Sequence, residues 1–167
     1  LGPFPSWIGK PPIQSLGDDR VTSVLDAILS RYDIIDTVIL AGDTESQFRF
    51  YEQNIPSYKE LFNAVYDNIK EKHPDVKIGN AFALHQVINK NLNHIVTELA
   101  IGDFVAFSYS SIDTLNYIVK TPQEAKEELQ LVFDLAGDKK VGIFEISWST
   151  SEFVGGNEEL QAEFVEK

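Results

Sequence analysis

The run KKVGIFEISWSTSE (residues 139–152) contains the feature that decides the fold: an apolar strand that ends in polar side chains. Its centre, from Val141 to Ile146, is apolar except for one carboxylate, Glu145. A charge inside a buried strand is costly unless it is paired or used. We therefore expect Glu145 to have either a chemical role or a stabilising partner.

Three similar apolar runs precede this strand, at residues 37–42, 76–83 and 103–109. The segments between them carry apolar residues at spacings of three and four, which is typical of amphipathic helices. Nearly continuous apolar strands that alternate with helices predict an α/β fold with parallel strands buried on both faces. We expect residues 1–167 to form a single domain, opened by the Pro-rich loop LGPFPSWIGKPP (residues 1–12).

Capping residues indicate where the helices begin. We expect capping boxes at Ser57 and at Thr121, each with a glutamate three residues later. Asn157 is expected to cap a final helix, and the apolar spacing over residues 84–100 predicts one continuous helix there.

The composition restricts the class of partner and the compartment. The net charge of −12 argues against nucleic acid or an anionic membrane as partner. No apolar stretch is long enough to span a membrane, and the three histidines lack metal-ligand spacing, so neither a span nor a metal site is expected. The absence of cysteine is compatible with an extracellular or cell-surface protein, and the absence of methionine suggests a mature or excised piece.

Polar and aromatic side chains follow the predicted strands, where sites gather in parallel α/β folds. The residues that we expect to form a site are Asp43, Glu45, Asn80, Tyr109, Glu145 and Trp148. Carboxylates for proton transfer and aromatic rings that stack on pyranose faces are what a sugar site requires. For Trp148 the alternative is packing against the last helix, and for Tyr109 it is packing in the core. For Glu45 the alternative is a solvated loop acid.

Three stretches resemble the later strands of clan A glycoside hydrolases, and most closely endo-galactanase-like (β/α)₈ barrels. They are YKELFNAVYDNIKEKHPDVKIGNAFALH (58–85), GDFVAFSYSSID (102–113) and the run from residue 139 to residue 167. The resemblance implies that FEISWST (144–150) ends strand seven of the barrel, with Glu145 as the nucleophile. It also implies a retaining mechanism on an oligo- or polysaccharide without a cofactor.

In this family the acid/base is a glutamate at the end of strand four, which corresponds to ILAGDTESQF (39–48). Aligned without a gap, Asp43 replaces the asparagine of the family and Thr44 replaces the glutamate. Glu45 comes one residue later, and such a step turns a side chain to the other face of a regular strand. The acid/base role therefore falls on Glu45 only if the end of the strand turns.

The chain is shorter than the roughly 250 residues of a (β/α)₈ barrel. We therefore expect a partial TIM barrel that lacks about three βα units, with sheet edges open to the missing segments or to another chain. The leading hypothesis is a fragment or reduced form of a glycoside hydrolase. The alternatives are a non-catalytic carbohydrate-binding or structural relative that has lost the general acid, and a flavodoxin-like domain. The flavodoxin-like alternative lacks a glycine-rich phosphate loop.

Overall fold

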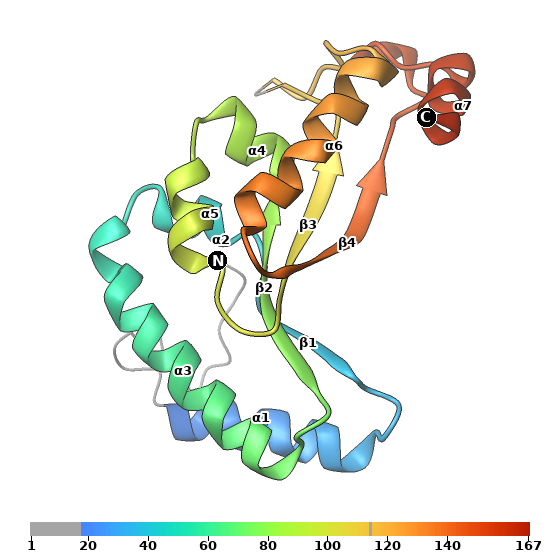
Figure 1. The fold of residues 1–167 in the computed structure, drawn as a ribbon. Helices are drawn as coiled ribbons and strands as arrows, with labels where there is room; N and C mark the ends of the chain where they lie inside the picture. The colour runs from blue at the N-terminus through green and yellow to red at the C-terminus, as the bar shows by residue number, and fades with distance from the viewer. Residues whose placement is uncertain (1–17, 114) are drawn as a thin grey trace. The chain divides into compact units, whose positions relative to one another are not determined.

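A computed structural model describes residues 18–113 and 115–167, and the expected N-terminal loop lies outside these residues. Helices, short 3₁₀ turns (η) and strands alternate along the chain (Figure 1). Their bounds are α1 Asp18–Arg31, β1 Thr37–Ala41, α2 Thr44–Phe48, η2 Glu52–Asn54, α3 Ile55–Lys72, β2 Lys77–Ala83, α4 Leu84–Asn89, α5 Asn93–Leu99, β3 Phe104–Ser110, α6 Pro122–Ala136, β4 Lys140–Ser147, η3 Glu152–Val154 and α7 Glu158–Glu166.

The four strands form one parallel sheet in the order β1-β2-β3-β4. The predicted α/β class and all four predicted strands are thus confirmed. In the register, Ala83 of β2 lies opposite Ser108 of β3, and Ser108 lies opposite Glu145 of β4. A bulge interrupts the β3–β4 register, because Phe107 pairs with Ile143 and the next residue, Ser108, pairs with Glu145.

Helices α5, α6 and α7 contact the same face of the sheet. Asn80 of β2 donates to the Leu99 carbonyl at the end of α5 over 3.0 Å, and Tyr109 of β3 donates to Glu128 of α6 over 2.7 Å. The ring of Tyr109 also stacks on Phe164 of α7. Since side chains alternate along a strand and Phe82 pairs with Phe107, Asn80 and Tyr109 lie on one face.

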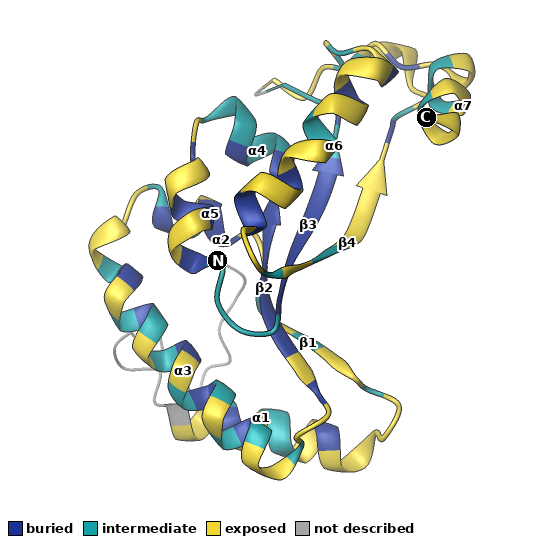
Figure 2. Ribbon diagram, in the orientation of Figure 1, coloured by how far each residue is buried: buried dark blue, intermediate teal, exposed yellow. Residues whose placement is uncertain are grey.

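Burial differs sharply between the inner strands and the edge strands (Figure 2). Strands β2 and β3 are almost wholly buried, whereas most of β4 is exposed, including Glu145. The expectation that every strand is buried is therefore wrong for β1 and for β4, each of which has one strand neighbour among the described residues. The charge of Glu145 remains in contact with solvent and needs no buried partner.

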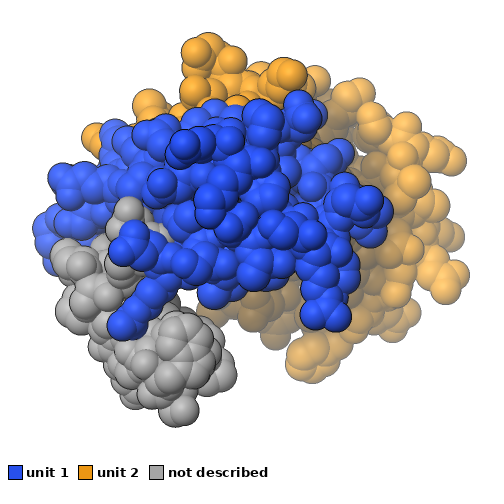
Figure 3. Space-filling model, turned by 90° about the horizontal axis from the view of Figure 1, so that it is seen from below, with its two compact units in different colours: residues 1–38, 51–77 blue, residues 39–50, 78–167 orange. Residues whose placement is uncertain are grey.

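The chain divides into two compact units, which Figure 3 colours separately. Unit 1 comprises residues 1–38 and 51–77, and in its described part helices α1 and α3 pack together. Lys72 at the end of α3 forms an ion pair with Asp26 of α1 at 2.6 Å, and His73 contacts the same carboxylate at 2.9 Å. The hydrogen bond from Lys72 has the largest effect on the pKa of Asp26 and lowers it, and the bond from His73 lowers it further.

Unit 2 comprises residues 39–50 and 78–167, and it contains most of the sheet. Its core includes Phe82 and Phe107 from the inner strands, whose ring centroids are 6.0 Å apart. The capping box at Thr121 is confirmed, and so is the cap at Asn157, whose side chain accepts from the Leu160 N–H over 2.7 Å. The first cap begins α6, which precedes β4, and the second begins α7, which follows β4.

Two helix predictions are wrong. The expected helix over 84–100 is broken into α4 and α5, because Asn91 adopts the left-handed conformation with φ of 55°. Asparagine tolerates this conformation better than most residues. The capping box at Ser57 is absent, since α3 already begins at Ile55 and has Pro56 in its first turn, where proline is well tolerated.

We expect Gly79→Ala to destabilise unit 2 much more than Gly142→Ala. A Cβ at Gly79 would lie 2.2 Å from the Phe104 carbonyl oxygen of the neighbouring strand, so the backbone must shift. Such overpacking typically costs about 1–3 kcal/mol. At Gly142 the nearest atom is the Ala106 Cβ at 4.0 Å, which is ordinary contact. Urea unfolding of both variants checks this, and equal midpoints would contradict the close approach of β2 and β3.

Candidate functional site

The candidate site lies at the carboxyl ends of the strands, along the transverse row formed by Ala83, Ser108 and Glu145. Paired residues of a parallel sheet point to the same face. The hydroxyls of Ser110 and Ser147, one pair further along, are 2.7 Å apart and confirm this direction for β3 and β4. Glu145 therefore shares a face with Ser108, Ser110 and Ser147.

Glu45 reaches the same row from the end of β1. Its Oε2 accepts the backbone N–H of Ala83 over 3.1 Å, and its Oε1 accepts the Ser46 hydroxyl over 2.8 Å. The side chain is fully buried, with 0% exposure. The expectation of a solvated loop acid is therefore wrong.

A turn at Asp43 directs Glu45 inward. Asp43 adopts the left-handed conformation, with φ of 46° and ψ of 41°, which ends the strand and starts α2 at Thr44. Thr44 secures this turn, because its hydroxyl donates to the Ala81 carbonyl over 2.9 Å. Glu45 is thus a first-turn residue of a helix, and the alternation that would have turned it away in a strand does not apply.

Burial raises the pKa of Glu45 above its ordinary value of 4.5. The bonds from Ser46 and from the Ala83 N–H act in the opposite direction and lower the pKa, but burial has the larger effect. A raised pKa favours the protonated form of a glutamate, which is the form that a general acid needs. Its two hydrogen bonds also fix the position of the carboxyl group.

The raised pKa of Glu45 predicts a pH-dependent contribution to stability. In the unfolded chain Glu45 has a pKa near 4.5 and loses its proton above that pH, whereas in the folded state it keeps the proton to a higher pH. The free energy of unfolding therefore falls as the pH rises from the unfolded pKa to the folded pKa. We expect the stability of Glu45→Gln relative to the unmodified chain to increase as the pH rises above about 4.5. Urea unfolding across this range checks the trend. Glu152→Gln, at an exposed turn, is the control, and parallel curves for all three proteins would contradict burial of an ionisable Glu45.

Three of the other predicted site residues, Tyr109, Trp148 and Asn80, lie away from the face of Glu145. Tyr109 donates a hydrogen bond to Glu128. Burial has the largest effect on the pKa of its hydroxyl and raises it, and the bond to Glu128 raises it further. Trp148 is buried against Phe164 of α7, with ring centroids 5.0 Å apart. Asn80 is fully buried on the helix-covered face, and Asp43 is exposed at the turn before Glu45.

Two further residues assist the site, and one of them, Ser147, was not singled out from the sequence. Ser46 orients the Glu45 carboxyl group, and Ser147 extends the polar row beyond Glu145. The period-two spacing of Glu145 and Ser147 could have revealed the second. His85, which follows β2, has a buried Nδ1 without a hydrogen-bond partner among the described residues, and burial lowers its pKa, which favours the neutral ring.

The described residues contain no group of three or more metal-ligating side chains. None of their helices is long and apolar enough to cross a membrane. No protein-family model, curated protein or solved structure matches the chain.

Proposed function

We propose that the chain is a fragment or reduced form of a retaining glycoside hydrolase that acts on an oligo- or polysaccharide, with Glu145 as nucleophile and Glu45 as acid/base. The observation that carries the proposal is the buried Glu45, whose pKa is raised and whose carboxyl group bonds to the backbone of Ala83, the β2 residue in the register row that contains Glu145. Retaining hydrolysis needs an ionised nucleophile and a protonated acid. The exposed carboxylate of Glu145 suits the first role, and the buried carboxyl group of Glu45 suits the second.

The proposed reaction has two steps. In the first, the protonated Glu45 gives its proton to the glycosidic oxygen while a carboxylate oxygen of Glu145 bonds to the anomeric carbon, and the leaving sugar departs as an alcohol. In the second, Glu45 as carboxylate takes a proton from water, whose oxygen bonds to the anomeric carbon and displaces Glu145. The anomeric configuration is thereby retained.

The sheet order supports the barrel that this proposal implies. Sequential parallel strands with right-handed crossovers place all their helices on one face, whereas a doubly wound fold reverses its strand order. The contacts of α5, α6 and α7 with one face agree with the first arrangement. We therefore interpret β1 to β4 as strands four to seven of a (β/α)₈ barrel. An extracellular or cell-surface location belongs to the same proposal.

Hydrolysis and binding assays separate the enzyme from a carbohydrate-binding relative without activity. We expect the chain to release aryl alcohols from some members of a panel of aryl glycosides and to lose this activity in Glu145→Gln. Glu152→Gln, at the exposed turn η3, is the matched control and should keep it. Polysaccharide binding without hydrolysis on any member of the panel would favour the binding protein.

A further inference from the structure

The carboxyl group of Glu45 is closed off from a substrate by its burial. Its side chain has 0% exposure, and both of its oxygens have partners: the Ala83 N–H lies 3.1 Å from Oε2 and the Ser46 hydroxyl lies 2.8 Å from Oε1. A general acid must lie within hydrogen-bond reach of the oxygen that it protonates, directly or through one water. Proton transfer to the glycosidic oxygen therefore needs a group that connects Glu45 to the surface.

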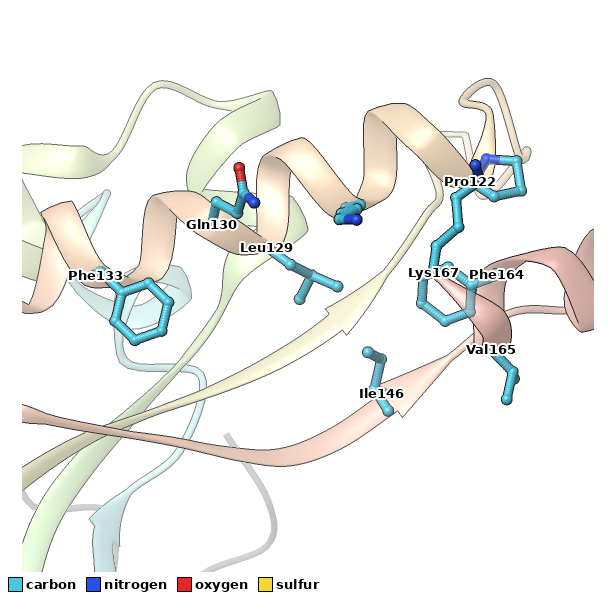
Figure 4. A pocket seen from close by; sticks show the side chains of 9 residues that line it. Pro122, Leu129, Gln130, Phe133, Ile146, Phe164, Val165 and Lys167 are labelled. Atoms are coloured by element: carbon cyan, nitrogen blue, oxygen red, sulfur yellow. The ribbon is translucent and has the colours of Figure 1, made fainter.

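The apolar groove of unit 2 does not provide this connection. The groove has a volume of about 510 Å³ and is lined by residues of α6, β4 and α7 and by Lys167 just after α7. Figure 4 shows Leu129 and Ile146 projecting into the space between α6 and β4. Ile146 follows Glu145 and pairs with Tyr109, so the groove lies on the helix-covered face, opposite to the face of Glu145.

Ser46 connects the buried carboxyl group to the surface. It follows Glu45 directly in the first turn of α2 and, in contrast to Glu45, it is exposed. The backbone N–H of Ala83 can only donate, so Oε2 accepts this bond whether Glu45 is protonated or ionised. A serine hydroxyl both donates and accepts. Of these two partners, Ser46 is thus the one that can change its role when Glu45 gains or loses a proton.

We propose that Ser46 relays the proton of Glu45 to the glycosidic oxygen. In protonated Glu45, the O–H at Oε1 donates to Oγ of Ser46, which frees the hydrogen of Ser46 for the substrate. Ser46 gives this hydrogen to the glycosidic oxygen while its Oγ takes the proton from Oε1. The bond between the anomeric carbon and the leaving oxygen breaks, and Glu45 becomes a carboxylate. Ser46 then donates to Oε1, which is the bond that the structure shows.

The second step of the reaction uses the same path in reverse. Water gives a proton to Oγ of Ser46 while Ser46 returns its own hydrogen to Oε1 of Glu45, and the oxygen of this water bonds to the anomeric carbon and displaces Glu145. Ser46 is a neutral hydroxyl before and after each step. The inference rests on the proposed hydrolase activity and makes Ser46 a catalytic residue, because its hydroxyl touches the reacting oxygen.

The leaving-group dependence of Ser46→Ala tests the relay first. We expect this variant to lose about 10²-fold or more on polysaccharide and on phenyl glycosides, and to keep its rate on dinitrophenyl glycosides, whose leaving group needs no proton. Ser46→Thr preserves the hydroxyl and should restore the lost activity. Ser30→Ala is the matched control, because Ser30 is also an exposed helical serine whose hydroxyl bonds to a carboxylate, that of Asp26, over 3.5 Å.

Rates in mixtures of H₂O and D₂O separate a relay from a serine that only orients Glu45. A relay moves two protons in one step, so kcat/KM of the unmodified chain on phenyl glycosides should fall along a curve as the fraction of D₂O rises. An orienting serine leaves one proton in motion and gives a straight line. A straight line, or hydrolysis of polysaccharide that survives Ser46→Ala, would overturn the relay alone. Absence of hydrolysis by the unmodified chain would overturn both the relay and the proposed function.

Discussion

Glu145→Gln is expected to abolish hydrolysis of every glycoside that the chain cleaves, whereas Glu45→Gln is expected to spare substrates with the best leaving groups. The nucleophile is needed for every substrate, because its oxygen forms the bond to the anomeric carbon. The acid is needed only where the departing oxygen must be protonated, so a dinitrophenolate, which is stable as an anion, leaves without it. We expect Glu45→Gln to lose about 10²–10⁴-fold on polysaccharide.

Initial rates on dinitrophenyl glycosides, phenyl glycosides and polysaccharide measure this difference between the two variants. Glu152→Gln should match the unmodified chain on all three substrates, because Glu152 is exposed at η3. If Glu45→Gln loses activity equally on all leaving groups, Glu45 is not the acid. If Glu145→Gln retains activity on any substrate, Glu145 is not the nucleophile.

Phe107→Ala is expected to cause the largest loss of stability among single substitutions in unit 2. Phe107 is completely buried between the inner strands and the helices, and its ring lies beside that of Phe82. Truncation of a buried phenylalanine typically costs about 3–5 kcal/mol, because it leaves a cavity as well as removing apolar contact. Urea unfolding followed by circular dichroism measures the change.

Phe153→Ala is the matched control for this substitution. Phe153 is 84% exposed in η3, so the same truncation should change the free energy of unfolding by no more than about 0.5 kcal/mol. Similar losses in the two variants would show that the side chain of Phe107 is not part of a packed core.

The strands were predictable from the sequence because each is a continuous apolar run that ends in polar residues. The break in the helix over residues 84–100 and the exposure of β4 were harder to predict. Asn91 divides the helical spacing of residues 84–100 without any proline or glycine, since an asparagine can adopt the left-handed conformation at small cost. The exposure of β4 follows from its place at the edge of the sheet, which an apolar sequence does not specify.

The candidate site was predictable in one half only. Glu145 stands out as a carboxylate in an apolar strand, whereas the aim of Glu45 depends on one backbone turn, at Asp43, that the sequence does not specify. Trp148 could have been assigned to the other face, because it lies three residues after Glu145, an odd step along a strand. The partner of Tyr109 is on α6, nineteen residues away, and only the packing of that helix reveals it.

Trapping of the covalent intermediate tests whether Glu145 bonds to the sugar. A panel of 2-deoxy-2-fluoroglycosides with a dinitrophenolate leaving group should form the glycosyl ester and slow its hydrolysis, since the fluorine replaces the 2-hydroxyl that stabilises the transition state. Peptide mass spectrometry then locates the label. We predict one sugar per chain, on Glu145 within the 139–152 peptide, and no label in Glu145→Gln. A label on another carboxylate, or no label from a compound that the chain cleaves in its unfluorinated form, would show that Glu145 is not the nucleophile.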